Sequence, residues 1–205
     1  MRHIKRRTNR KLRKKRILIV IAGLILVAGV IVGLVSLLHK SNEQVQHAAY
    51  PQEYQEIVNQ YTTQFQVEPS LVYAVMKAES GFDPHAHSGA DARGLMQITP
   101  ETFEWLQWQM PDDPEYTGED LYNPEINIRY GCKFLSILQG TYQDLGTCIA
   151  AYNAGMGNVN RWLSDSDYSD DGTTLKEIPY PETKTYVQRV LSNYQQYKSL
   201  YNSQK

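Results

Sequence analysis

The chain has 205 residues, which gives room for one ordinary domain with short additional segments. Its formal net charge of −1 hides an asymmetry. Residues 1–16 hold ten Lys and Arg side chains and no Asp or Glu, so the other 189 residues carry 11 basic and 22 acidic groups. A basic segment is therefore joined to an acidic body.

Residues 17–38 form a run of 22 residues without a charge, long enough to span a hydrocarbon core of about 30 Å. The basic cluster before it predicts a cytoplasmic N-terminus and a body on the extracytoplasmic side. The alternative is a cleaved signal peptide, but such an apolar region has about 7–15 residues and ends in a small-x-small site. We therefore expect a retained, single-pass anchor. The basic tail is then an orientation signal near anionic lipid, which argues against nucleic-acid binding.

These features divide the chain into a basic tail (1–16), a transmembrane signal anchor (17–38), a polar stalk (39–50), a domain-sized body (51–200) and a short tail (201–205). No confident period-two strand pattern and no internal repeat occur in the body. We expect a compact, mainly α-helical domain of about 150 residues, which is enough for a hydrophobic core.

Proline and capping residues predict the first helices of the body. Pro51 predicts a helix over about 52–66, and Pro69 predicts one that ends near 80–81, where glycine suits a C-terminal cap. Thr99 followed by Pro100 predicts a third helix to about residue 110. Asn123 followed by proline repeats that pattern for a helix to about residue 139.

Three further helices are expected towards the C-terminus. A short one over about 145–154 should end at Gly155, and Asn158 should cap one more turn through Trp162. Pro181 should open a final helix that runs to about residue 200. Cys132 and Cys148 lie in this half of the body. They either form a disulfide that closes a loop of about 15 residues or remain two buried free thiols, and the sequence leaves both open.

Glu79 is a carboxylate at the end of an apolar helical face. The residues that share its face at spacings of three and four are Leu71, Val72, Val75 and Met76. Apolar surroundings, the negative end of a helix and an acidic body all disfavour the ionised form of a carboxyl group and raise its pKa. A glutamic acid that stays protonated near neutral pH can act as a general acid at a glycosidic oxygen. The alternative is a structural glutamate in a salt bridge.

Three other stretches could carry chemistry, although each also has a structural explanation. GLMQI (94–98) is either a buried turn or the wall of a cleft in which Gln97 offers an amide to a sugar. In AAYNAGMGNV (150–159), Tyr152 and Asn153 either pack and cap a helix or hydrogen-bond to sugar hydroxyls. In ETKTYVQRV (182–190), Glu182 compensates a helix dipole and Tyr186 fits a core stripe, unless both face a site.

The ordered set A-E-S-G-F, G-L-M-Q, A-Y-N-A-G and E-T-x-x-Y-V resembles the soluble lytic transglycosylase domain, which is related in fold to goose-type lysozymes. The resemblance extends from about residue 52 to about 198 and implies a mainly helical fold of the lysozyme-like α+β superfamily with a deep cleft. It implies cleavage of the β-1,4 bond between N-acetylmuramic acid and N-acetylglucosamine in peptidoglycan, with Glu79 as the catalytic acid. Other residues implied at the substrate site are Ser80, Met96, Gln97, Tyr152, Asn153, Tyr186 and Glu182.

The resemblance also implies a mechanism with one essential carboxylate and neither metal nor cofactor. Glu79 would act first as acid and then as base, and the muramic C6 hydroxyl would close a 1,6-anhydro ring. Water in its place would make the protein a hydrolytic muramidase, for which Asp83 or Asp91 could serve as a second carboxylate. A catalytically silent wall-binding scaffold within a secretion, conjugation or division assembly is the alternative from another functional class.

Three further patterns are weaker signals of function. Asp83, His85 and His87 could suggest a metal site, but no second ligand cluster supports it. The acidic stretch 164–172 lacks the glycine position of a calcium-binding EF-hand and is interpreted as a solvated loop. The aromatic side chains that could stack on sugars, if they reach the cleft, are Trp105, Trp108 and Tyr122.

Overall fold

The computed structural model describes residues 26, 28–38, 40–41 and 44–202. They divide into one unit that ends at Pro51 and a second that begins at Gln52. In the first unit, residues 28–38 are helical and their large apolar side chains are exposed. No helix within the described part of the chain is long and apolar enough to cross a membrane. The expected basic tail (1–16) and positions 17–25 and 27 of the expected anchor lie outside the described residues.

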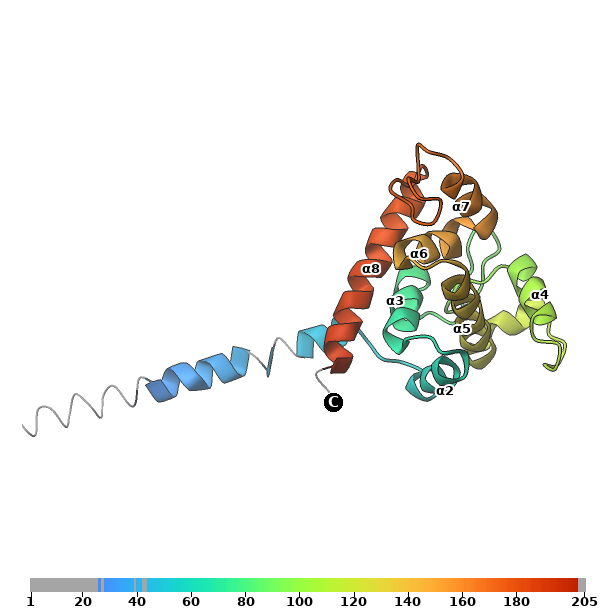
Figure 1. The fold of residues 1–205 in the computed structure, drawn as a ribbon. Coiled ribbons are helices and arrows are strands. Elements are labelled where there is room, and N and C mark those ends of the chain that lie inside the picture. The colour runs from blue at the N-terminus through green and yellow to red at the C-terminus, as the bar shows by residue number, and fades with distance from the viewer. Residues whose placement is uncertain (1–25, 27, 39, 42–43, 203–205) are drawn as a thin grey trace, which may run out of the picture. The chain divides into compact units, whose positions relative to one another are not determined.

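The second unit is helical, which confirms the mainly α class (Figure 1). Its elements are α2 (Gln55–Phe65), α3 (Pro69–Glu79), α4 (Pro100–Trp108), the 3-10 helix η1 (Gly118–Tyr122), α5 (Pro124–Thr141), α6 (Leu145–Ala154), α7 (Met156–Leu163) and α8 (Pro181–Asn202). Among the residues described, β-type pairing is limited to isolated bridges from Arg93 to His87 and to Ile98.

Local sequence signals explain where most of these helices begin. Proline occupies the first position of α3, α4, α5 and α8, where a missing N–H costs no helical hydrogen bond. The Thr99 side chain accepts a hydrogen bond from the Thr102 N–H, and the Asn123 side chain accepts one from the Glu125 N–H at 2.9 Å. These two N-caps satisfy backbone donors that a helix leaves unpaired.

Two predicted helix starts are wrong. Pro51 does not open α2, because Tyr54 has a left-handed backbone with φ of 60° and the helix can begin only at Gln55. Asn158 is not an N-cap, because α7 begins two residues earlier at Met156. The Asn158 Nδ2 instead donates a hydrogen bond to the Ala154 carbonyl at 2.7 Å. The 3-10 helix η1 was not among the predicted elements.

The long helix α8 packs along α3 and α6, as Figure 1 shows. The rings of Tyr73 on α3 and Tyr197 on α8 lie 5.4 Å apart, and both residues are fully buried. Burial of each Val, Leu or Met side chain of α3 stabilises the fold by about 1.5–3 kcal/mol. The packing of α3 against α8 therefore fixes the position of the last residue of α3, which is Glu79.

Both cysteines are free thiols in this structure. Cys132 lies in α5 and Cys148 in α6, and both are buried. Burial raises the pKa of the Cys148 thiol to about 12 and that of Cys132 further. A thiol that remains protonated is a weak nucleophile, so these two residues act as small apolar groups of the core.

Candidate active site

Glu79 ends a helix whose preceding residues are almost all inside the core. Every residue of α3 from Ser70 to Met76 is buried, whereas Glu79 keeps part of its surface accessible. Burial raises the pKa of Glu79 from 4.5 to about 7, although a phenol hydrogen bond and a nearby guanidinium both act to lower it. The direction of this shift agrees with the expectation that apolar surroundings disfavour the ionised form of this carboxyl group. Such a group can donate a proton to a bound molecule near neutral pH.

Tyr186 contacts Glu79 from the opposite helix. Its Oη donates a hydrogen bond of 2.6 Å to the Oε1 of Glu79, across 107 residues of sequence. Burial raises the pKa of Tyr186 well above 10, so the phenol stays a donor. Arg189 follows one turn later on α8, with its guanidinium carbon 5.7 Å from the centre of the Tyr186 ring. This guanidinium is the group whose positive charge lowers the pKa of Glu79.

The GLMQ segment is held from three directions. The Tyr152 hydroxyl donates to the Met96 carbonyl at 2.8 Å, and the Met96 N–H donates to the Asn127 Oδ1 at 2.7 Å. Met96 is completely buried, so its side chain packs in the core, and the expectation that it contacts substrate is wrong. The Gln97 Nε2 donates to the Ala86 and Gly94 carbonyls at 3.0 and 2.9 Å. Both N–H groups of this amide are therefore used within the loop.

Two glycines allow this segment to approach helix α5. At Gly94, where φ is +73°, an added Cβ would lie 2.2 Å from the Leu121 carbonyl oxygen and 2.4 Å from the Asn127 Nδ2. At Gly131 an added Cβ would lie 2.1 Å from the sulfur of Met96. Any larger residue at either position would push the GLMQ segment away from the helix.

Asn153 is fixed by a residue of α8. The Thr183 hydroxyl donates a hydrogen bond of 2.8 Å to the Asn153 Oδ1, and Thr183 is almost completely buried. This contact fixes the orientation of the amide and directs its N–H groups away from Thr183. Glu182, one residue earlier, is exposed in the first turn of α8. The inward-facing polar residue of the E-T-x-x-Y-V motif, besides Tyr186, is therefore Thr183.

Ser80 joins the end of α3 to the GLMQ segment. Its hydroxyl donates to the Leu95 carbonyl at 2.8 Å, and it accepts a hydrogen bond of 3.1 Å from the Phe82 N–H. This hydroxyl therefore holds the loop against the helix end that carries Glu79.

The two aspartates considered as second carboxylates have local partners in their loop. The Asp83 Oδ1 accepts a hydrogen bond from the His85 N–H at 2.9 Å, as in an Asx turn. Asp91 accepts from the Arg93 Nε at 2.9 Å and contacts the His87 Nε2 at 2.8 Å. The hydrogen bond from Arg93 holds the pKa of Asp91 below its ordinary value. Among the residues described, no three His, Cys, Asp or Glu side chains gather where they could hold a metal.

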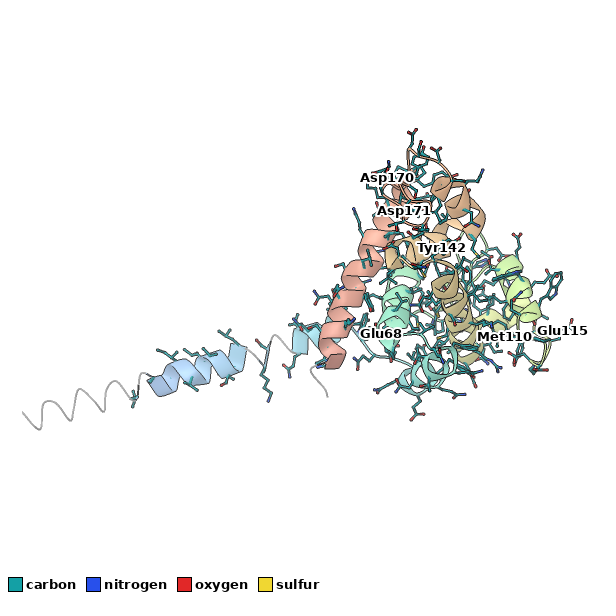
Figure 2. The ribbon with its side chains drawn as sticks, viewed as in Figure 1. Glu68, Met110, Glu115, Tyr142, Asp170 and Asp171 are labelled. Carbon is teal, nitrogen blue, oxygen red and sulfur yellow. The ribbon has the colours of Figure 1, made fainter. Side chains whose placement is uncertain are left out.

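The acidic stretch 164–172 is an ordered loop before α8, where Figure 2 shows Asp170 and Asp171. The Asp171 Oδ1 accepts hydrogen bonds from the backbone N–H groups of Thr173 and Thr174 at 2.8 and 2.7 Å. Its carboxylate therefore stabilises the loop itself.

The three aromatic residues considered for sugar stacking have different surroundings. Trp105 packs edge-on against Phe134, with ring centres 6.1 Å apart. Tyr122 lies beside the rings of His85 and His87 and under the guanidinium of Arg93. Trp108 is 75% exposed at the end of α4.

Sequence reasoning missed Asn127, Thr183 and Arg189. Asn127 is completely buried, and its Nδ2 donates to the Arg93 and Leu121 carbonyls at 2.9 and 2.8 Å. It lies four residues before Gly131, on the same helical face. A buried amide and a glycine on one helical face indicate that another segment of backbone packs closely against that face. This pattern could have identified the contact between α5 and the GLMQ segment.

Comparison with known proteins gives a consistent result. The family model described as the transglycosylase SLT domain matches residues 56–174, more than half of the chain. A soluble lytic murein transglycosylase of Salmonella typhimurium is 36% identical over 149 residues, which cover 70% of this chain and 22% of that protein. Membrane-bound lytic murein transglycosylase C of Yersinia enterocolitica is 37% identical over 123 residues, which cover 55% and 34%.

Solved structures agree. The 70-kDa soluble lytic transglycosylase of Escherichia coli matches with a TM-score of 0.68 and 28% identity over 76% of this chain and 26% of that one. An inactive glutamate-to-glutamine mutant of the Pseudomonas aeruginosa lytic transglycosylase matches with a TM-score of 0.67 and 30% identity, over 76% and 25%. The chain thus spans between about a fifth and a third of the length of these relatives. Because the family model covers α2 to α7 and includes Glu79 and the GLMQ segment, this chain belongs to the transglycosylase SLT domain family.

Proposed function

We propose that this protein is a peptidoglycan lytic transglycosylase. It cleaves the β-1,4 bond between N-acetylmuramic acid and N-acetylglucosamine and leaves a 1,6-anhydromuramic acid end. The observation that carries the proposal is the Glu79 carboxyl, which has a pKa of about 7 and accepts a 2.6 Å hydrogen bond from a buried phenol. The names of the relatives, which are lytic murein transglycosylases, supply the substrate class.

In the first step, Glu79 gives its proton to the glycosidic oxygen, and the bond from that oxygen to C1 of muramic acid breaks. The substrate's own 2-acetamido oxygen stabilises the positive charge that develops at C1. In the second step, the Glu79 carboxylate takes the proton of the C6 hydroxyl, and that oxygen attacks C1. The anhydro ring closes, and Glu79 is protonated again. One carboxyl group is sufficient for both steps.

The surrounding residues position this chemistry. Tyr186 holds one oxygen of Glu79 and stabilises its carboxylate form by hydrogen bonding. Asn153, oriented by Thr183, offers amide N–H groups to the sugar at the reaction centre. Tyr152 fixes the wall through the Met96 carbonyl.

Gln97 keeps its carbonyl oxygen for the substrate, since its N–H groups bind the loop. Ser80 acts through the Leu95 carbonyl, and the exposed Glu182 adds negative charge in the first turn of α8.

The products decide between this reaction and the alternatives. Purified peptidoglycan is digested with the full chain, and the released fragments are weighed by mass spectrometry. Muramic ends one water lighter than reducing ends support the transglycosylase, whereas reducing ends identify a hydrolytic muramidase. If the protein sediments with purified peptidoglycan but releases no soluble fragments, it is a non-catalytic wall-binding scaffold.

We further propose that residues 17–38 anchor the protein in the cell membrane as a single-pass helix, with the catalytic domain on the cell-wall side. Support comes from the uncharged run and from apolar side chains that remain exposed, from Leu26 at 70% to Leu38 at 68%. The stalk over 39–50 would then reach at most about 40 Å from the membrane. Extraction of the protein from membranes by detergent, but not by high salt or carbonate, tests the anchor. An intact mass that lacks the N-terminal segment would instead indicate a cleaved signal peptide.

A further inference from the structure

A second concave site lies between α4, the loop after it and η1. It is a pocket of about 500 Å³, within the size range of small-ligand sites. The residues on which the argument depends are Phe103, Glu104, Trp108, Asp113, Glu115 and Tyr116. Figure 2 labels Glu115 and one further member of the lining, Met110, in this loop next to α4. None of the lining residues belongs to the set around Glu79, so the pocket is a separate feature.

Hydrogen bonds hold the pocket in shape. The Gln107 side chain bonds both backbone groups of Tyr116: its Oε1 accepts from the Tyr116 N–H at 2.8 Å, and its Nε2 donates to the carbonyl at 3.2 Å. Asp113 forms an ion pair with Arg129 and accepts a hydrogen bond of 3.1 Å from the Tyr130 hydroxyl. The pocket therefore exists before any ligand binds, which lowers the entropic cost of binding.

The remaining polar groups of the pocket are acidic. Its lining includes three carboxylates, Glu104, Asp113 and Glu115, and no Lys, Arg or His. Asp113 is neutralised by Arg129, whereas Glu104 and Glu115 are exposed and form no ion pair with any residue that the structure describes. Trp108 adds an indole that is 75% exposed. Carboxylates attract a cation electrostatically, and an indole face attracts a cation through its quadrupole.

We propose that this pocket binds the ammonium group of a peptide. Given the proposed function, on which this identification of the ligand rests, the source is the amine-bearing stem peptide that muramic acid carries in peptidoglycan. The methylene stem of a diamino acid would lie against the Trp108 and Tyr116 rings, and its ammonium group would lie between Glu104 and Glu115. A neutral sugar could donate hydrogen bonds to these carboxylates, but only a cation adds attraction between opposite charges and a contact with the indole face. The protein would thus hold its substrate by the peptide as well as by the glycan.

Binding can be measured without catalysis. The full chain in detergent is titrated with acetyl-L-Ala-D-isoGln-L-Lys amide, whose only charge is the lysine ammonium, and the signal is the Trp108 indole N–H resonance in NMR. The matched probe is the same peptide acetylated on the lysine nitrogen, which removes the charge. We expect acetylation to raise Kd by about fivefold or more, and salt to weaken binding of the charged peptide only.

Variants separate this pocket from general acidity. The double variant Glu104→Gln, Glu115→Gln should raise Kd for the charged peptide to that of the acetylated one. Glu101→Gln, on the same helix but outside the pocket, should leave Kd unchanged. Near-ultraviolet circular dichroism verifies that each variant is folded. Equal binding of both probes, or an equal effect of Glu101→Gln and the double variant, would overturn the proposal.

Digestion of peptidoglycan by the wild-type chain is measured in parallel. Wall digestion without charge-dependent peptide binding removes only the pocket proposal. Charge-dependent peptide binding without wall digestion removes the catalytic proposal and keeps the pocket. A lysine-containing peptide of unrelated sequence that binds at least about tenfold tighter than the stem peptide would overturn the identification of the ligand as wall peptide.

Discussion

Glu79 and Asp91 are carboxylates in neighbouring segments with opposite environments. Glu79 is surrounded by core residues and by the Tyr186 phenol, and burial raises its pKa to about 7. Asp91 is half exposed, lies between Arg93 and His87, and has a lowered pKa. The comparison teaches that solvation and partners, not residue type, decide which carboxyl group can hold a proton at neutral pH. Only Glu79 is suited to donate a proton at neutral pH, so substitutions at Glu79 and at Asp91 should have very different effects on activity.

The strongest test of the comparison is Glu79→Gln, which keeps the shape of the side chain and removes its titratable proton. We expect release of soluble muropeptides to fall by at least about 10³-fold, because the acid and the base are lost together. Turnover is followed by chromatography of the released fragments. If the variant digests purified wall at a rate near that of the wild type, Glu79 is not the catalytic acid.

Tyr186→Phe removes one hydrogen bond from the Glu79 carboxyl and retains the ring. We expect a loss of about 10- to 100-fold in kcat, the usual range for a hydrogen bond to a charged group. Because this hydrogen bond lowers the pKa of Glu79, its loss should raise that pKa. The decline of activity at basic pH should then move to higher pH. An unchanged pH profile would mean that Tyr186 serves packing only.

The raised pKa of Glu79 also has a cost in stability. As pH rises from about 4.5, the unfolded chain releases this proton while the folded protein keeps it until about pH 7, so the free energy of unfolding falls across that interval. Glutamine has no proton to release. At pH 8, Glu79→Gln should therefore be more stable than the wild type by roughly 1–3 kcal/mol, allowing for the partial exposure of the side chain.

Chemical denaturation at pH 4 and pH 8 checks this expectation. The two proteins should have the same stability at pH 4 and differ at pH 8. A difference of the same size at both pH values would attribute the gain to packing and not to proton release.

The smallest effect is expected from Asp91→Asn. An exposed ion pair contributes little to stability, and an ionised aspartate cannot donate a proton, so activity should stay within about twofold of the wild type. Initial rates on purified wall measure it, with Asp83→Asn as the matched control in the same loop. A loss of 100-fold in either variant would restore the two-carboxylate hydrolytic mechanism as an alternative.

Much of the helical framework could be predicted from the sequence because its signals are local. Prolines and the caps Thr99 and Asn123 mark helix starts, and the spacing of apolar residues on α3 identified Glu79. Both signals depend on residues within two turns of one another. The start of α2 was missed because Tyr54 adopts a left-handed backbone that no local signal requires of a tyrosine.

The site was harder to predict, because its polar contacts join distant segments. Thr183 meets Asn153 across 30 residues, and Asn127 meets Met96 across 31. Neither pair has a periodic pattern, since each depends on how two elements pack. The E-T-x-x-Y-V motif directed attention to Glu182, whereas the direction of side chains in the first turn of α8 turns Thr183 inward.

The contacts of Asn127 determine when the GLMQ segment can unfold locally. Its single amide joins the Met96 N–H, the Arg93 carbonyl and the Leu121 carbonyl inside the core. A segment without regular secondary structure is thus bound to the first turn of α5, and the Met96 amide proton can reach solvent only when those contacts break. In hydrogen exchange, the Met96 amide proton should be among the slowest to exchange with solvent. Its rate should match the rates of the α5 amide protons and not those of the surface turns.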